Sequence, residues 1–267
     1  MIITSRECNP YNTRVTPLQL EKRTSQNAGI ESIENGWRLN LESGQARSYR
    51  LAQLDDYGHL SRGAFPHRPP LHLSVKARAS QNILPGTWGF GLWNDPFGLS
   101  LGFGATARRL PSLPNAAWFF FASPENYLSF HNGLAGNGAM ASVNRSPQIP
   151  APFIAFNLPL LPLLAWPPGS RWLRRRASQY IQQDAIALEH DQTIWHQYGL
   201  TWETDAVGFM LDDKEIFKAH TSPIPPLGLV IWIDNQYAAW LPDGRLRYGL
   251  LPTPNDCWVE IKDLRVH

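Results

Sequence analysis

The sequence predicts an all-β fold, a sandwich of two antiparallel sheets. Short strand-like runs follow one another at hairpin-like intervals and are separated by Pro, Gly and Asn. No helical pattern recurs between these runs, which argues against the alternating architecture of a parallel sheet. The chain of 267 residues contains 20 Gly and 23 Pro, as expected for a fold with many turns. A β-sandwich of this length can form one domain and bury a core that needs no disulfide or metal.

The strands are predicted in order along the chain. Residues 1–35 are mixed and polar, so we expect a lead-in segment followed by a single domain at 36–267. The run LHLSVKARA (71–79) alternates apolar and polar residues, which is typical of a strand with one buried face. The other runs before the middle of the chain are GWRLNLE (36–42), ARSYRLAQL (46–54), GTWGFGLWN (86–94), FGLSLGFG (97–104), AAWFFFA (116–122) and NYLSFH (126–131). After a Gly-rich loop and a Pro-rich insertion at about 144–180 come AIALEHD, TIWHQYGLTWE, AVGFMLDDKEIFKAH, LGLVIWIDNQ and CWVEIKDLRVH.

The run NAAWFFFASPEN (115–126) departs from this alternation. From Trp118 to Ala122 it carries no polar side chain, so both faces of the strand are apolar. Because successive side chains point to opposite faces, Trp118, Phe120 and Ala122 share one face, and Phe119 and Phe121 share the other. We predict that one set packs in the core and the other lines a binding cleft.

The segment HQYGLTWETDAVGFMLDDKEIF (196–217) describes a hairpin that ends in an acidic turn. It resembles the late hairpin of family 16 glycoside hydrolases, which share the concanavalin A-like jelly roll. Asp213 stands where that family usually has Gly. The stretches LPGTWGFGLWND (84–95), PPLGLVIWIDNQYAAW (225–240) and CWVEIKDLRVH (257–267) are similar to other strands of the family. The resemblance covers residues 36–267, apart from the dissimilar insertion, and implies a jelly-roll sandwich with a concave cleft.

The catalytic strand of that family, Glu-x-Asp-x-Glu, is missing. Retaining hydrolysis needs two carboxyl groups about 5 Å apart, yet no carboxylate occurs between Asp95 and Glu125. Glu189 with Asp191, and Asp213 with Glu215, have strand spacing but lie before and within the late hairpin, where surface acids are expected. We therefore predict no hydrolysis of β-glucans. The remaining candidates for proton transfer are Asp95, Glu125, His131 and Asp234.

The aromatic residues predict the character of the cleft. Aromatic rings stack against the apolar faces of sugars and equally against flat apolar ligands. The candidates for ligand binding are Trp88, Trp93, Trp118, Phe120, Trp232 and Trp240, with Asn235 and Gln236 as hydrogen-bonding partners. We expect two or three of the five Trp to line the cleft and the others to fill the core. For Asn235 and Gln236 the alternative is a turn or bulge.

The insertion combines apolar residues, Pro and a basic cluster. No charged residue lies between Arg145 and Arg171, and the prolines exclude a membrane-spanning helix. Three roles are compatible with this pattern: peripheral contact with a membrane, a cover over the cleft mouth, or a contact in a homo-oligomer. We predict the cover, with Arg171, Arg174, Arg175 and Arg176 binding anionic head groups or an anionic end of the ligand.

Composition limits the other function classes. The net charge of +2 gives no general attraction to nucleic acid, and no phosphate loop, metal-ligand set or cofactor motif occurs, so we expect no metal and no cofactor. The N-terminus has no apolar run typical of a signal peptide, which favours a cytoplasmic protein. Cys8 and Cys257 are read as unpaired thiols, with a bridge between them as the alternative. Two functions remain: non-hydrolytic binding of a saccharide or glycolipid, or acid/base isomerisation or cyclisation of a lipid- or terpenoid-like molecule in the same cleft.

Overall fold

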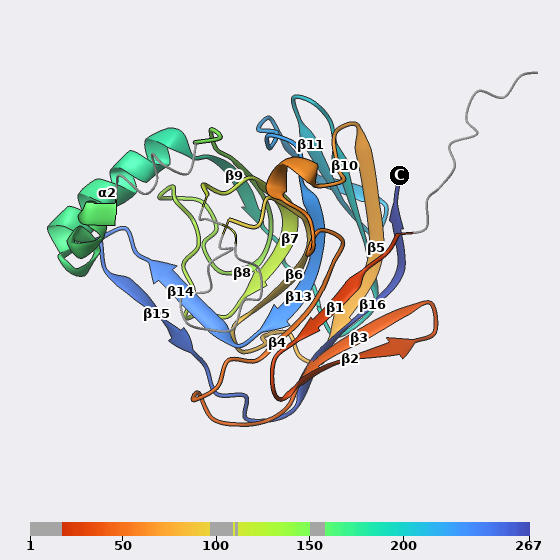
Figure 1. Ribbon diagram of the computed structural model, residues 1–267. Helices are drawn as coiled ribbons and strands as arrows, with labels where there is room; N and C mark the ends of the chain where they lie inside the picture. The colour runs from red at the N-terminus through yellow and green to blue at the C-terminus, as the bar shows by residue number, and fades with distance from the viewer. Residues whose placement is uncertain (1–17, 97–108, 110–111, 150–157) are drawn as a thin grey trace, which may run out of the picture.

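The computed structural model describes residues 18–96, 109, 112–149 and 158–267. Within these residues the largest elements are two antiparallel sheets of seven strands each (Figure 1). The prediction of an all-β sandwich with two antiparallel sheets is confirmed. Among the described elements, a two-stranded sheet and an α-helix extend from one end of the sandwich.

The first sheet holds the strand that breaks the alternation of apolar and polar residues. In spatial order its strands are β1 (Glu21–Thr24), β4 (Leu51–Asp55), β13 (Gly228–Asp234), β6 (Thr87–Trp93), β7 (Ala116–Ala122), β8 (Gly138–Arg145) and β9 (Gln182–Ala187). The aromatic strand β7 therefore lies between β6 and β8 in the interior of the sheet, and its residues are buried apart from the half-buried Trp118.

The second sheet packs against the first. Its spatial order is β12 (Lys214–Ala219), β11 (Val207–Leu211), β10 (His196–Trp202), β5 (Leu71–Ala79), β16 (Cys257–Val266), β3 (Gly36–Leu41) and β2 (Ala28–Ile33). The separate hairpin consists of β14 (Gln236–Trp240) and β15 (Leu246–Leu250). In β5 every second residue from Leu71 is buried, so the predicted alternation is confirmed.

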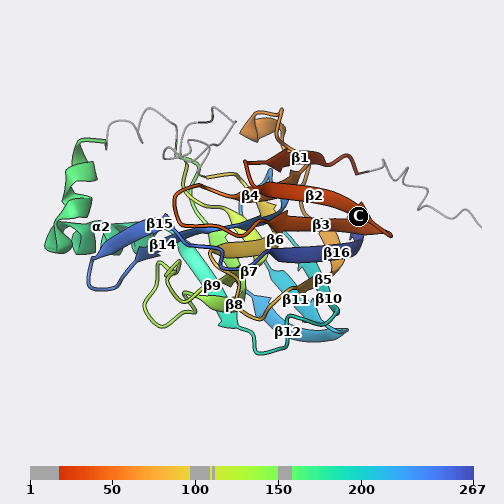
Figure 2. The ribbon, with the colours of Figure 1, turned by 90° about the horizontal axis from the view of Figure 1, so that it is seen from below.

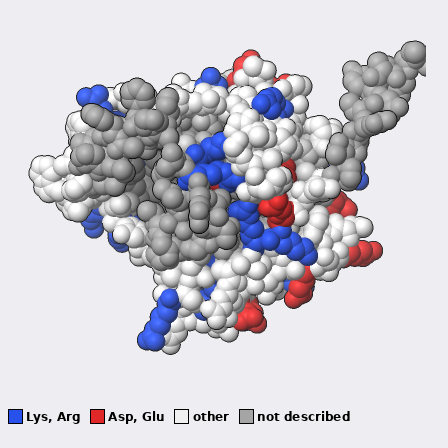
Figure 3. Space-filling model, viewed as in Figure 1, with Lys and Arg blue, Asp and Glu red and all other residues white. Residues whose placement is uncertain are grey.

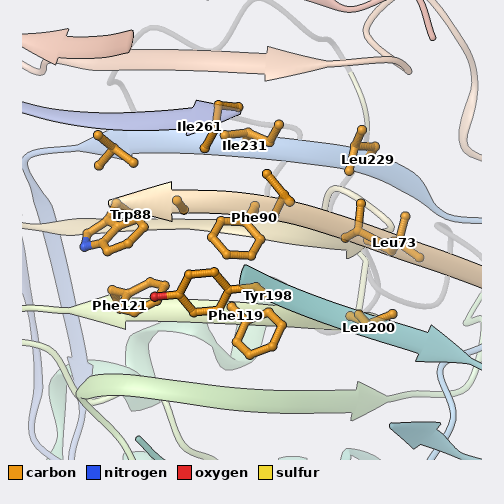
Figure 4. Close-up of a cluster of buried hydrophobic side chains, with 14 of the residues drawn as sticks. Leu73, Trp88, Phe90, Phe119, Phe121, Tyr198, Leu200, Leu229, Ile231 and Ile261 are labelled. Carbon is orange, nitrogen blue, oxygen red and sulfur yellow. The ribbon is translucent and has the colours of Figure 1, made fainter. Parts of the chain in front are cut away.

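The main core lies between the two sheets. Trp88, Phe119 and Phe121 from the first sheet point towards Tyr198 and Leu200 from the second (Figure 4). The rings of Trp88 and Phe121 stack with centroids 3.7 Å apart and planes 5° from parallel. This core assigns Phe119 and Phe121 to the inner face of β7, as one alternating set was predicted to lie.

The acidic turn of the late hairpin has the geometry that its sequence requires. Asp212 and Asp213 connect β11 to β12 and have φ angles of 49° and 62°. A two-residue hairpin turn of type I′ needs positive φ at both central residues, and Asp tolerates this conformation better than most residues. Asp213 therefore adopts a backbone conformation that Gly would also take in this turn.

Several boundaries differ from the prediction. Residues 1–35 were expected to precede the domain, yet β1 and β2 are edge strands of the two sheets, so the sandwich begins before position 36. The run 126–131 contributes only an isolated bridge between Tyr127 and Ala239. The Phe130 N–H donates instead to the Gln183 side chain of β9, and the Asn126 carbonyl accepts from the Asn137 side chain. Part of the presumed Gly-rich loop forms β8, and β14 and β15 were not predicted. The predicted strand at 97–104 lies outside the described residues.

The described part of the insertion contains two helices. The 3-10 helix η2 spans Leu158–Ala165, and the α-helix α2 spans Pro167–Tyr180; a further 3-10 turn, η1 (Arg62–Ala64), lies elsewhere. Two views place α2 at one end of the molecule, beside the β14–β15 hairpin (Figures 1 and 2). Trp240 of β14 donates a hydrogen bond to Ser170 of α2 at 2.9 Å, which fixes the helix to the hairpin. No helix in the described part of the chain is long and apolar enough to cross a membrane.

Candidate functional site

The outer face of the first sheet, which points away from the second sheet, carries four neighbouring aromatic rings. They belong to Trp93, Trp118, Phe120 and Trp232, and we call these residues the aromatic face. The ring centroids of Trp118 lie 5.0 Å from Phe120 and 5.7 Å from Trp232. Trp93 and Trp232 have nearly parallel planes and centroids 6.3 Å apart. Phe120 and Trp232 are 8% and 7% exposed, whereas Trp93 and Trp118 are only partly buried.

A glycine makes room for this arrangement. Gly89 pairs with Trp232 across β6 and β13 and with Phe120 across β6 and β7. A Cβ atom on Gly89 would lie 2.8 Å from Cη2 of Trp232, which is too close for the indole to stay in place. Glycine within a strand commonly marks such a close approach. The sequence Gly-Phe-Gly in β6 therefore allows a large ring to lie across the strand.

A polar network borders the aromatic face at one end. The indole N–H of Trp93 donates to Oη of Tyr57 at 2.6 Å, and the Gln53 amide donates to Asp55 at 2.9 Å. Asp55 is fully buried and pairs with Arg23 at 2.9 Å. Burial raises the pKa of Asp55, while the Gln53 hydrogen bond and the Arg23 charge act in the opposite direction. These residues were not predicted, although Gln53 and Asp55 alternate with apolar residues at the end of β4.

Asp95 lies near the same end but is committed to an ion pair. Its carboxylate lies 2.6 Å from Arg109, and both side chains are mostly buried. Arg109 also donates to the backbone carbonyl groups of Tyr57, Gly58 and Leu60. Asp95 thus anchors a guanidinium that holds a loop, which does not favour its predicted role in proton transfer. Basic side chains gather near the middle of this side of the molecule, with acidic ones beside them (Figure 3).

Asp234 lies at the opposite border, at the end of β13. Its Oδ1 accepts hydrogen bonds from the Thr87 hydroxyl at 2.8 Å and from backbone N–H groups, and Tyr49 donates to Oδ2 at 3.3 Å. The same Thr87 hydroxyl accepts from the Trp232 indole at 3.0 Å, which links Asp234 to the aromatic face. Burial raises the pKa of Asp234 to about 7 despite the hydrogen bonds, which act to lower it. A carboxyl group with this pKa can exchange a proton near neutral pH.

A second set of predicted residues comes together beside α2. His131, Arg171, Arg174 and Arg175 line a pocket of about 180 Å³ together with Phe130, Asn132, Ser178 and Pro242. Trp240 lies near this pocket, since its ring approaches that of Phe130 at 6.4 Å. Arg176 is not among the lining residues, and its guanidinium lies over the ring of Trp172. His131 was predicted as a proton-transfer group of the cleft, but it lies in this pocket beside α2 and not at the aromatic face.

Several predicted contacts are corrected by their burial. Trp88 is 2% exposed in the core between the sheets, so it does not line a cleft. Asn235 is fully buried, and its amide bonds to backbone groups of Ser48, Arg50 and Leu251, so it stabilises the loops around β13.

The remaining candidates lie at the surface or at a strand end. Glu125 is exposed in the turn after β7, and Glu189 and Asp191 are exposed as expected of surface acids. Gln236 begins β14, and its backbone N–H donates to Asp234. Cys257 is a buried free thiol, and Cys8 lies outside the described residues. Within those residues no group of three or more His, Cys, Asp or Glu could hold a metal ion.

No family model matches the chain, and no curated protein matches it. Solved structures similar to it include a β-glucanase from Bacillus licheniformis, with 9% identity, a TM-score of 0.48 and coverage of 96% of this chain and 95% of the other. A legume lectin-like domain from Entamoeba histolytica has 11% identity, a TM-score of 0.46 and coverage of 93% and 89%. A sialidase has 8% identity and a TM-score of 0.43, and the chain covers 17% of its length. These values say nothing about activity, and the sandwich assignment rests on the two sheets themselves.

Proposed function

We propose that the protein binds a saccharide or the sugar portion of a glycolipid on the aromatic face and does not hydrolyse it. The observation that supports this proposal is the contiguous set of rings on Trp93, Trp118 and Trp232, of which Trp93 and Trp118 reach solvent. Indole rings stack against the apolar faces of sugars, and polar groups at the border can orient the hydroxyl groups.

The absence of hydrolysis follows from strand β7. Its outward positions carry Trp118, Phe120 and Ala122, so the strand supplies no carboxylate to the aromatic face. The nearby acids are held in place by other groups, with Asp55 paired to Arg23 and Asp95 paired to Arg109. A retaining or inverting mechanism needs two carboxyl groups on opposite sides of one glycosidic bond.

The proposal can be tested by glycan-array screening followed by calorimetric titration of the best glycan. Trp118→Ala should weaken binding about fivefold or more, since stacking on one aromatic ring contributes on the order of 1 kcal/mol or more. Trp172→Ala is the matched control, because Trp172 is 47% exposed on α2 and lies outside the aromatic face. Equal weakening by both variants, or no bound glycan or glycolipid at all, would contradict the proposal.

Asp234 favours a second candidate, acid/base isomerisation or cyclisation of an apolar small molecule at the same face. The pKa of Asp234 of about 7 suits a group that both accepts and donates a proton. Mass spectrometry of molecules that co-purify with the protein would identify the substrate class. Turnover that is lost in Asp234→Asn while binding persists would support the enzyme, whereas unchanged turnover would exclude Asp234 as its acid or base.

A further inference from the structure

The pocket beside α2 has an unusual charge balance. Arg171, Arg174 and Arg175 follow a spacing of three and four residues, so they lie on one side of the helix. The opposite wall comes from Phe130, His131 and Asn132. Among the described residues no carboxylate side chain lines the pocket, and the sequence contains no acidic residue from 126 to 183. The repulsion among the three guanidinium groups is therefore not balanced within the helix.

The buried charge of Arg174 makes the lack of acidic partners energetically unfavourable. The residue is 3% exposed, and its guanidinium donates to the Phe130 carbonyl at 2.8 Å and to Oδ1 of Asn132 at 3.2 Å. Both acceptors are neutral, and Nε has no hydrogen-bond partner. Arg174 forms no ion pair within the described part of the chain. A buried charge without a counter-charge carries a desolvation cost that an anion could offset.

The other two arginines leave capacity for a ligand. Arg171 donates to the backbone carbonyl of Asp243 at 3.2 and 3.3 Å, while the Asp243 carboxylate pairs with Arg245 at 2.7 Å. Arg175 is exposed. Guanidinium groups bind oxyanions through paired, charge-assisted hydrogen bonds, and the pocket volume of about 180 Å³ is sufficient for a phosphate group.

We propose that this pocket binds a phosphate group, with Arg171, Arg174 and Arg175 as its positive ligands and Asn132 and Ser178 at its edge. The phosphate could belong to a lipid head group or to a small phosphorylated molecule. Exposed aromatic residues on and before α2, namely Trp166, Trp172 and Tyr180, lie next to the pocket in sequence and favour a lipid surface as the source. This site is separate from the aromatic face and does not depend on its function.

Calorimetric titration with inorganic phosphate tests the pocket itself. Arg171→Gln and Arg175→Gln should each weaken binding about tenfold, the effect expected for losing charge-assisted hydrogen bonds. Arg176→Gln should change it less than about twofold, because this exposed arginine is on the same helix but stacks over Trp172 outside the pocket. The buried Arg174 is not chosen, since its loss would affect folding.

Co-sedimentation with phosphatidylcholine vesicles, with and without phosphatidic acid, identifies the source of the phosphate. Binding only to vesicles with phosphatidic acid, weakened by Arg175→Gln and by Trp166→Ala but not by Arg176→Gln, would establish a lipid head group. If inorganic phosphate binds, Arg175→Gln weakens it more than Arg176→Gln, and no vesicles bind, the ligand would be a soluble phosphorylated compound. Equal loss with Arg175→Gln and Arg176→Gln, or no binding to either probe, would overturn the proposal.

Discussion

Two adjacent residues of β7 allow a direct test of how the strand divides its side chains. Phe119 is 1% exposed and packs between the sheets, whereas Trp118 belongs to the partly exposed aromatic face. Phe119 forms edge-to-face contacts with Tyr198 at 5.0 Å and with Phe209 at 5.2 Å. Both partners lie on the second sheet, so this ring contributes to the packing of one sheet on the other.

The structure gives different magnitudes for the two substitutions. Removal of a buried Phe ring costs about 3–5 kcal/mol, and each aromatic pair adds about 0.5–1.5 kcal/mol beyond burial. Phe119→Ala should therefore lower the free energy of unfolding by about 4–5 kcal/mol, the upper end of this range. Trp118→Ala removes a partly solvated ring whose ring contacts, among the described residues, are with the aromatic face, so we expect about half of that cost.

Urea unfolding followed by far-UV circular dichroism measures both free energies of unfolding. The spectrum of each folded variant serves as the control that the sandwich is intact. Glycan binding is measured in parallel, and only Trp118→Ala should weaken it while the protein stays folded. Equal destabilisation by the two substitutions would refute the division of β7 into a core face and a ligand face, and the proposed site with it.

Three further predictions rest on titratable groups. Because burial raises the pKa of Asp234 from 3.8 to about 7, the folded state binds this proton more tightly than the unfolded state. The free energy of unfolding should therefore fall as pH rises from about 4 to about 7. Asp234→Asn should remove that fall in urea unfolding at a series of pH values, and an unchanged pH profile would contradict the raised pKa. Glu260 is 4% exposed and pairs with Arg38 at 2.6 Å and Arg78 at 2.7 Å, so Glu260→Gln should lower the melting temperature, with a cost of about 2 kcal/mol. No reducing sugar should be released from laminarin, lichenan or agarose; release that is abolished by Glu189→Gln or Asp191→Asn would show that the catalytic pair has moved to another strand.

The fold could be predicted because its signals are local. The strict alternation of Leu71, Leu73 and Val75 defines the buried face of β5. The two-residue turn at Asp212 and Asp213 sets the pairing of β11 and β12 next to the turn, up to the register shift at Phe209 and Met210. The edge strands β1 and β2 were missed because they carry few apolar residues, as strands with half-exposed faces do. β1 pairs with β4, about thirty positions farther along the chain, whereas β2 pairs with β3 across a two-residue turn, Glu34 and Asn35, that was not predicted.

The aromatic face could be predicted in part. Trp88 and Trp93 are five positions apart on one strand, so alternation alone places them on opposite faces and excludes that both line a cleft. The structure has Trp88 in the core and Trp93 on the outer face. The polar border was not predictable in the same way. It joins Gln53, Tyr57 and Arg109 with Trp93 and Asp95, and no local pattern indicates contacts over such separations in sequence.

In the basic cluster, helical periodicity shows which arginines are neighbours, which the composition alone does not. As a run in the sequence, Arg171, Arg174, Arg175 and Arg176 form one positive group. On an α-helix, residues three and four apart are neighbours, so Arg171, Arg174 and Arg175 share a side, while Arg176 falls beside Trp172. Helical periodicity therefore separates Arg171, Arg174 and Arg175 from the solvent-exposed Arg176. It does not predict which part of the protein the first three arginines face. The opposite side of the pocket comes from His131 and Asn132, about forty positions earlier in the chain. Asn132 accepts a hydrogen bond from Arg174, the buried arginine of the cluster. The test of the pocket accordingly rests on comparing Arg175 with Arg176, two neighbours with the same charge and different surroundings.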